Sequence, residues 1–491
     1  MRRAFWLAGV GLLATLASAP ARAIDPFFPE FGNNGYDVQD YDLSLAVDPA
    51  KNRLDGRAVL TIRALERLTA VALDLHGLDV KGVRTDGAVS SFTHSGGKLR
   101  VRLPSPLAKG ATFVLAVAYG GNPEALEDPT APGADILGVG WNDHAGATYV
   151  VSEPVGAGTW YPVNDVPTDK ATYRVAATVP EPYTAVSNGA LESITDLGAE
   201  RRFVWKTRQP MASYLAILDV ADYRLERSWA RRALPIRTYT TDKTPSGTIA
   251  ALRKTPAMLA YFERFAGPYP FGSYGSVMVD DPELYYALET QGMSTFPSAY
   301  QIGESTVAHE LAHQWFGDAV TVERWEDLWL AEGFATYFEF IWEFKSDRVG
   351  LDAAFRDLYD YALENELGPA VVSTPEDIFS DRTYYRGALT LQALRLRVGD
   401  DAFFRTLKAF FRNHRYGNAT SADFVDTAVR QSGQPAVRGL LNAWLYEQPV
   451  PPLGDYYGPS GARTAKAKAA LPFATALTRR HPPRLAAAPG N

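Results

Sequence analysis

Apolar and polar residues alternate along much of the first half of the chain, from about residue 36 to residue 225. One such run has its apolar positions at Tyr41, Leu43, Leu45 and Val47, and a later run has them at Tyr173, Val175, Ala177 and Val179. Alternation of this kind turns one face of a strand toward a core and the other toward water. Turn-forming pieces at 95–97 and 188–189 separate the runs, and no helical pattern intervenes. The pattern predicts an N-terminal, antiparallel β-sandwich-like domain over residues 24–230.

The pattern changes near residue 230. Apolar residues at helical spacing follow, and we expect helices around 248–266, 304–316, 327–345 and 385–398, with a strand at 275–280. These segments predict a mainly helical second domain over residues 231–452. The fold class is therefore multidomain α+β, and a length of 491 residues agrees with more than one core.

Both ends of the chain differ from this body. Arg2 and Arg3 precede an apolar run, and small residues at 21 and 23 provide a cleavage site, so residues 1–23 are interpreted as a signal peptide. Either general secretory or twin-arginine export fits this segment, and we expect a periplasmic or secreted protein. No other segment is apolar enough for a stable membrane span. Residues 453–491 are rich in Ala, Pro and basic residues, which predicts a disordered tail.

Composition narrows the chemistry. The formal net charge of −7 disfavours nucleic acid as a partner. Cysteine is absent, which excludes thiol nucleophiles and thiolate ligands. Any metal ion must therefore be held by histidines and carboxylates.

One stretch meets that requirement. His309 and His313 are four residues apart, so on a helix both point the same way and can reach one zinc ion. Glu310 lies beside the first of them and can serve as general base toward a water on the metal. Glu332, on the next expected helix, provides a third ligand if the two helices pack together. Ordinary hydrogen-bonded histidines are the alternative, but unpaired histidines on an apolar helix would be costly.

These residues resemble the aminopeptidase N family of zinc metallopeptidases, of the gluzincin type, whose motif is H-E-x-x-H, eighteen residues, then Glu. The likeness covers residues 36–452, including the run 325–330. The resemblance implies a thermolysin-like catalytic domain with one Zn²⁺ ion, and peptides with a free N-terminus as substrates.

Three further roles are implied by the same resemblance. Tyr384, three residues before a Gly, would donate a hydrogen bond to the oxyanion, with Tyr385 as its rival. Glu289 matches the segment whose Glu binds the substrate's α-ammonium, although only Ala287 and Glu289 of that segment agree. Glu153 occupies the place of a second ammonium-binding residue from the N-terminal domain.

Glu339 lies seven residues after Glu332 and is a candidate to orient a metal-bound histidine.

Two matters stay open at this point. Many relatives carry a long helical C-terminal domain for which this chain has no room, so we expect a more open cleft that accepts peptides of varied length. A zinc endopeptidase, or a binding protein that kept the fold and lost activity, are the rival functions. The motif alone does not decide among them.

Overall fold

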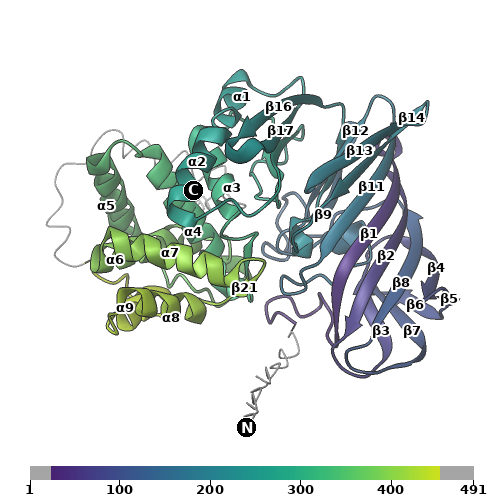
Figure 1. Cartoon of the computed structure of the whole chain (residues 1–491), viewed down its shortest axis with the longest axis horizontal. Coiled ribbons are helices and arrows are strands. Elements are labelled where there is room, and N and C mark those ends of the chain that lie inside the picture. The colour runs from purple at the N-terminus through teal and green to yellow at the C-terminus, as the bar shows by residue number, and fades with distance from the viewer. Residues whose placement is uncertain (1–23, 454–491) are drawn as a thin grey trace, which may run out of the picture.

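The computed structural model describes residues 24–453, which form a sheet-rich part and a helical part. Figure 1 shows the sheets to the right and most of the helices to the left. The predicted signal peptide lies outside the described residues, as does all of the predicted tail except residue 453. Within residues 24–453, no helix is both long enough and apolar enough to cross a membrane.

The largest sheet has eight strands in the order β13-β14-β11-β1-β2-β8-β4-β5. Their bounds are β1 (Tyr36–Asp48), β2 (Arg53–Ala64), β4 (Asp79–Thr85), β5 (Ala88–Val89), β8 (Thr112–Gly121), β11 (Thr172–Pro180), β13 (Ala190–Asp196) and β14 (Glu200–Lys206). The alternation predicted for β1 and β11 is confirmed, because their apolar positions are buried. β1 and β11 pair in parallel, whereas the other strand pairs of this sheet are antiparallel.

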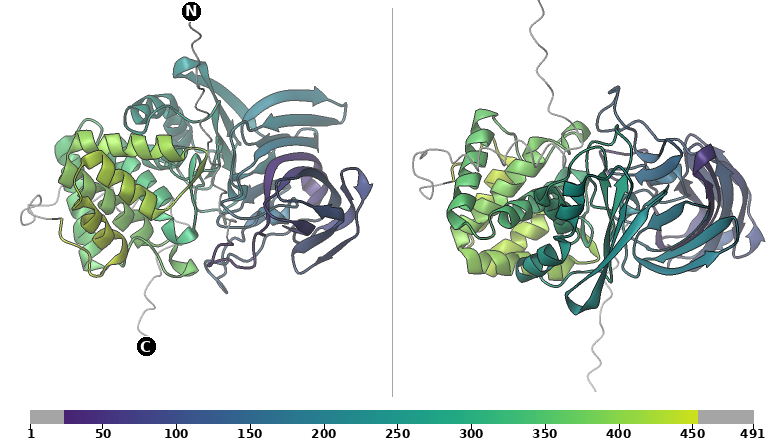
Figure 2. Two further views of the ribbon diagram at one scale, coloured as in Figure 1. Left: turned by 60° about the horizontal axis from the view of Figure 1, so that its bottom comes forward. Right: turned by 90° about the horizontal axis from the view of Figure 1, so that it is seen from above.

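Two smaller sheets complete the N-terminal domain. One has the order β3-β7-β6, with β3 (Leu68–Asp74), β6 (Phe92–Ser95) and β7 (Lys98–Leu107). The other has the order β12-β15-β10-β9, with β9 (Gly140–His144), β10 (Ala147–Val151), β12 (Thr184–Ser187) and β15 (Leu218–Ala221). All three sheets bury apolar residues in one shared core. The expected sandwich-like β domain is confirmed, and Figure 2 shows its strong curvature.

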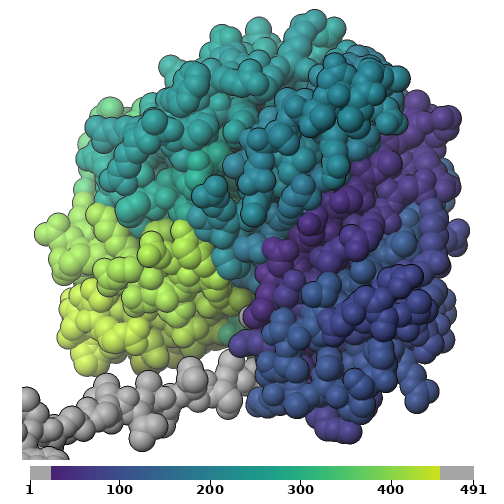
Figure 3. Space-filling model, turned by 45° about the vertical axis from the view of Figure 1, so that its right-hand side comes forward, coloured from purple at the N-terminus to yellow at the C-terminus, as the bar shows by residue number. Residues whose placement is uncertain are grey.

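A four-stranded sheet precedes the helices of the second domain, in the order β16-β17-β18-β19. It contains β16 (Arg224–Ala230), β17 (Leu234–Thr240), β18 (Tyr274–Val279) and β19 (Ser294–Pro297). The division placed at residue 230 falls inside this sheet, between β16 and β17, because the two strands form a hairpin. In Figure 3, teal residues from this part of the chain bridge the purple and blue strands and the yellow-green last helices.

Nine helices lie within the described residues: α1 (Ser246–Leu252), α2 (Thr255–Ala266), α3 (Glu304–His313), α4 (Trp329–Glu343), α5 (Arg348–Glu364), α6 (Gly387–Val398), α7 (Asp400–His414), α8 (Ser421–Ser432) and α9 (Val437–Tyr446). Every helix predicted from the periodicity is present, although the first divides into α1 and α2. Short strands β20 (Val320–Val322) and β21 (Gly417–Ala419) pair in parallel. The mainly helical second domain is thus confirmed.

A buried lysine ties the two domains together. Lys170, just before β11, donates from Nζ to the carbonyl of Asp318 at 2.7 Å and to Oγ1 of Thr321 at 2.8 Å. Both acceptors lie in the segment that follows α3. The N-terminal domain therefore supports the part of the chain that leaves the histidine-bearing helix.

Candidate metal centre and active site

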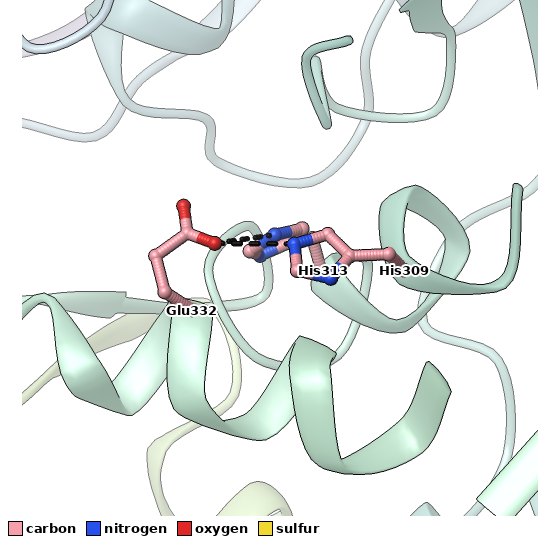
Figure 4. Close-up of side chains that lie close together, drawn as sticks. All are labelled: His309, His313 and Glu332. Atoms are coloured by element: carbon pink, nitrogen blue, oxygen red, sulfur yellow. Dashed lines mark hydrogen bonds and ion pairs between the residues drawn. The ribbon is translucent and has the colours of Figure 1, made fainter. Parts of the chain in front are cut away.

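The three predicted metal ligands converge between α3 and α4. His309 and His313 lie one turn apart on α3, with ring centroids 4.8 Å apart. Glu332 lies in the first turn of α4, and its Oε2 atom is 3.1 Å from Nε2 of His309 and 3.4 Å from Nε2 of His313. Figure 4 shows the carboxylate pointing at both rings from the opposite helix. All three residues are at most 3% exposed.

This arrangement fits a zinc ion. Bonds of about 2.0–2.1 Å at tetrahedral angles place neighbouring donor atoms roughly 3.3 Å apart. The two measured separations, 3.1 and 3.4 Å, agree with that value. One donor atom from each residue lies within 4.8 Å of the other two. Two imidazoles and one carboxylate are also the donor set of zinc sites that retain an open position.

The ligands are held in turn by outer contacts. Nδ1 of His309 lies 3.3 Å from Oε2 of Glu339, which is about two turns beyond Glu332 on the same face of α4. Nδ1 of His313 lies 3.2 Å from the carbonyl oxygen of Phe316. Such contacts fix the ring orientation and leave each Nε2 free to face the metal. The position expected for Glu339 is thus the one it occupies.

Charge complementarity is strong within this buried set. Burial opposes a charged His309, but the hydrogen bonds and charges of Glu332 and Glu339 outweigh burial and raise its pKa to about 9. Burial likewise opposes a charged Glu332, yet the two histidines lower its pKa to about 2. The site therefore stabilises positive charge beside Glu332, and a divalent cation meets the same demand.

Glu310 and Tyr384 lie in the same pocket as the ligands. The pocket is lined by Glu153, Tyr286, Ala287, Leu288, Glu289, His309, Glu310, His313, Glu332, Phe379 and Tyr384. Burial raises the pKa of Glu310 well above its usual range. The ring of Tyr384 stacks on that of His309 with centroids 6.1 Å apart. Both side chains can therefore face a substrate carbonyl brought to the metal.

The neighbouring Tyr385 points elsewhere. Its ring packs edge-on against Tyr361 at 5.5 Å, and it does not line the pocket. Tyr384 and Tyr385 lie in a π-helical turn, Arg382–Arg386, which leads into α6. Such turns are frequent at functional sites because they displace one residue from the regular helical face. The geometry favours Tyr384 over its rival.

Glu153 and Glu289 come to the site from different domains. Glu153 follows β10, and Glu289 lies beside β19, where Leu288 forms an antiparallel bridge with Thr295. One oxygen of each, together with one of Glu332, lies within 4.8 Å of the other two. Burial raises the pKa of Glu289, and its Oε1 atom has no hydrogen-bond partner among residues 24–453. Carboxylates gathered this closely repel one another and so favour a cationic group between them.

Gln314 holds two segments of the site together, a role that the metal-binding motif did not indicate. Its Nε2 donates to the carbonyl of Glu289 at 2.7 Å, and its Oε1 accepts from the amide of Gly292 at 2.7 Å. Gln314 directly follows His313, so one side chain couples the metal-binding helix to the segment that bears Glu289. Its place beside the second histidine was the available signal, but only the packing reveals its partners.

Comparison with known proteins identifies the lineage. The family model described as "Peptidase M1 N-terminal domain" matches residues 38–215, and "Peptidase family M1 domain" matches residues 250–444. The solved M1 zinc metallopeptidase from Deinococcus radiodurans is 33% identical, with a TM-score of 0.82 over 89% of this chain and 99% of that one. The chain belongs to peptidase family M1. A mutant of the Deinococcus protein bound to the substrate Tyr-Ser-Ala matches at 34% identity, with a TM-score of 0.82 over 88% of this chain and 99% of that one.

Curated relatives in the family are longer proteins. Aminopeptidase A from Gloydius brevicauda is 30% identical over 328 residues, which cover 61% of this chain and 34% of the relative. Probable aminopeptidase 2 from Sulfurisphaera tokodaii is 25% identical over 408 residues, 78% of this chain and 50% of that protein. The chain thus spans about a third to a half of their length. Because the structural neighbours are zinc metallopeptidases, zinc is the metal for which His309, His313 and Glu332 form a site.

Proposed function

We propose that the protein is a zinc-dependent aminopeptidase that hydrolyses the first peptide bond of peptides with a free N-terminus. The main support for this proposal is the pair of buried carboxylates, Glu153 and Glu289. One oxygen of each lies within 4.8 Å of an oxygen of the ligand Glu332. An α-ammonium group between them offsets the mutual repulsion of these carboxylates, which a neutral internal peptide bond does not do. The pair therefore favours the end of a chain over its middle.

The remaining residues act on the bond next to that ammonium group. When bound, zinc supplies a Lewis acid that polarises a carbonyl oxygen and lowers the pKa of water. Glu310 accepts a proton from the attacking water and delivers it to the leaving amine as general acid. Tyr384 donates a hydrogen bond from its hydroxyl group to the oxygen on which negative charge develops.

Two features of the surroundings support these roles. Every pocket residue named in the mechanism is buried, so charges act on the substrate with little screening by water. Gln314 holds the segment that bears Glu289, and Glu339 holds the ligand His309, so neither has to reorganise during the reaction. We further propose action on peptides outside the cytoplasm, in line with the export signal expected at residues 1–23. That nucleic acid is not a partner also stays a prediction.

The test combines metal content with a blocked substrate. Purified protein is assayed for zinc and for hydrolysis of aminoacyl-amide reporters, and of one peptide with its N-terminus free or acetylated. We expect cleavage only of the free form, one residue at a time. Equal cleavage of the acetylated peptide would identify an endopeptidase, and zinc-loaded protein inert toward all reporters would favour a binding role.

Glu310→Gln separates chemistry from metal binding. The variant is expected to retain zinc, because Glu310 is not a ligand, and to lose activity by at least about 100-fold, the effect of removing a general base. Full activity in this variant would overturn the proposed role of Glu310.

A further inference from the structure

A large cavity adjoins the catalytic pocket. Its volume is about 830 Å³, and it lies between residues 130–136 of the N-terminal domain and residues 361–382 of the helical domain. Phe379 lines both this cavity and the catalytic pocket. The volume falls within the range of roughly 300–1,000 Å³ that ligand pockets occupy. The cavity and the catalytic pocket therefore adjoin each other, and a substrate can extend from one into the other.

The surroundings of the catalytic pocket indicate the direction in which a bound peptide extends. The chain segments that carry Glu153 and Glu289 contribute to a buried apolar cluster, whose members include Tyr149, Tyr286 and Leu288. The free space among the catalytic residues themselves is only about 10 Å³. Because Phe379 borders both spaces, a peptide whose first residue is held by the two carboxylates can continue past this side chain into the cavity.

The cavity is acidic. Four carboxylates line it, Glu366, Glu376, Asp377 and Asp381, against one cation, Arg382. Arg382 is itself paired with Asp377, so its charge is already balanced.

The two stretches of sequence that form the walls of the cavity also lack basic residues. No Lys or Arg occurs between residues 110 and 169, which include the N-terminal wall, or between residues 357 and 381. A concave site of one sign of charge attracts ligands of the other sign.

We propose that this cavity binds the part of the substrate that follows the first residue, and that it selects peptides with Lys or Arg there. This inference rests on the proposed aminopeptidase function and names a substrate class for it. Ile136 and Tyr361 provide apolar surface for the stems of such side chains, while Glu366 and Glu376 face their charged ends.

The test compares two peptides, Leu-Ser-Lys-Lys-Ala and Leu-Ser-Glu-Glu-Ala, which share the first peptide bond. For the wild type we expect kcat/KM to favour the lysine peptide by about tenfold at roughly 0.05 M salt, and by about threefold or less at 0.5 M salt, because exposed charges are screened. In the double variant Glu366→Gln/Glu376→Gln the preference should fall to about twofold. The charge-reversed variant Glu376→Lys should shift the ratio further toward the glutamate peptide.

A matched control carries the same loss of charge elsewhere. Glu192→Gln/Glu200→Gln lies on exposed positions of the hairpin of β13 and β14, which does not line the cavity, and should keep the tenfold preference. Hydrolysis of an aminoacyl-amide reporter by the wild type checks the proposed function separately, because the reporter lacks following residues. If the reporter is cleaved but the peptide ratio is unaffected by salt and by both cavity variants, the cavity proposal is wrong and the aminopeptidase proposal stands.

Discussion

Gly333 and Gly387 lie back to back where α4 passes the start of α6. A methyl group placed on Gly333 would lie 2.7 Å from the Cα atom of Gly387, a distance that side-chain carbons do not tolerate. Gly333 follows the metal ligand Glu332, and Gly387 ends the turn that carries Tyr384. The absence of side chains at these two positions lets the two helices approach closely, which brings Glu332 and Tyr384 into one pocket.

Gly333→Ala is therefore expected to destabilise the protein. The new methyl group meets backbone atoms, so α4 and α6 must separate, at a cost of about 1–3 kcal/mol. Denaturant unfolding monitored by circular dichroism measures the change. Gly439→Ala is the matched control, since its methyl group on α9 meets no atom of the described part of the chain within 4 Å. The control should gain about 0.5–1 kcal/mol from better helix propensity. Equal effects in the two variants would refute the close-packing argument.

Removal of one hydroxyl group distinguishes Tyr384 from Tyr385. Tyr384→Phe should lower kcat by about 100- to 1,000-fold with little change in KM, because the lost hydrogen bond forms mainly in the transition state. Tyr385→Phe should retain most of the activity, since its ring packs against Tyr361 outside the catalytic pocket. Steady-state kinetics on one aminoacyl-amide reporter compares the variants. A larger loss of activity in Tyr385→Phe than in Tyr384→Phe would show that Tyr385, and not Tyr384, has the hydroxyl role.

Glu339→Gln tests the support of the first histidine. The amide keeps the shape of the side chain but removes the charge that orients His309, so zinc affinity should fall by about 10- to 100-fold. Competition with a chelator of known affinity gives the measurement without reference to activity. Glu343→Gln, at the last residue of α4, should leave the affinity unchanged. Unaltered zinc binding in Glu339→Gln would show that this contact is incidental.

Asp219 predicts a pH dependence of stability away from the active site. It is fully buried in β15, and although the amide of Val150 donates to it, burial raises its pKa to about 8. The unfolded value is about 3.9, so the folded state binds the extra proton between about pH 4 and pH 8. The contribution of Asp219 to the unfolding free energy therefore declines as pH rises through that window, and is smallest above pH 8.

Asp219→Asn removes this titration. We expect the unfolding free energy of the variant, relative to that of the wild type, to be higher near pH 8.5 than near pH 5 by at least about 1 kcal/mol. Urea unfolding at both pH values gives the difference. Asp222→Asn, at an exposed position just after β15, should follow the wild type at both. A gap between Asp219→Asn and wild type that is the same at the two pH values would contradict the assigned pKa.

Much of the fold could be predicted from local patterns in the sequence. Alternation placed the strands, because a strand with one buried face must repeat every two residues. The spacing of His309 and His313 put both rings on one helical face for the same kind of reason. The parallel pairing of β1 with β11 was out of reach, since it depends on where the chain returns after 120 residues or more of other structure. The division at residue 230 was likewise placed without knowledge that β16 and β17 form a hairpin.

By itself, then, the sequence determined the elements, the donor types and the helix that carries two of the three ligands, because these follow from periodicities within one segment. Tertiary structure alone decided which separate segments meet. It set Glu332 3.1 Å from His309 and turned Tyr384 rather than Tyr385 to the pocket. It also brought Glu153 to Glu289 and left an acidic cavity beyond Phe379. These relationships depend on packing between distant parts of the chain, to which no local pattern is sensitive.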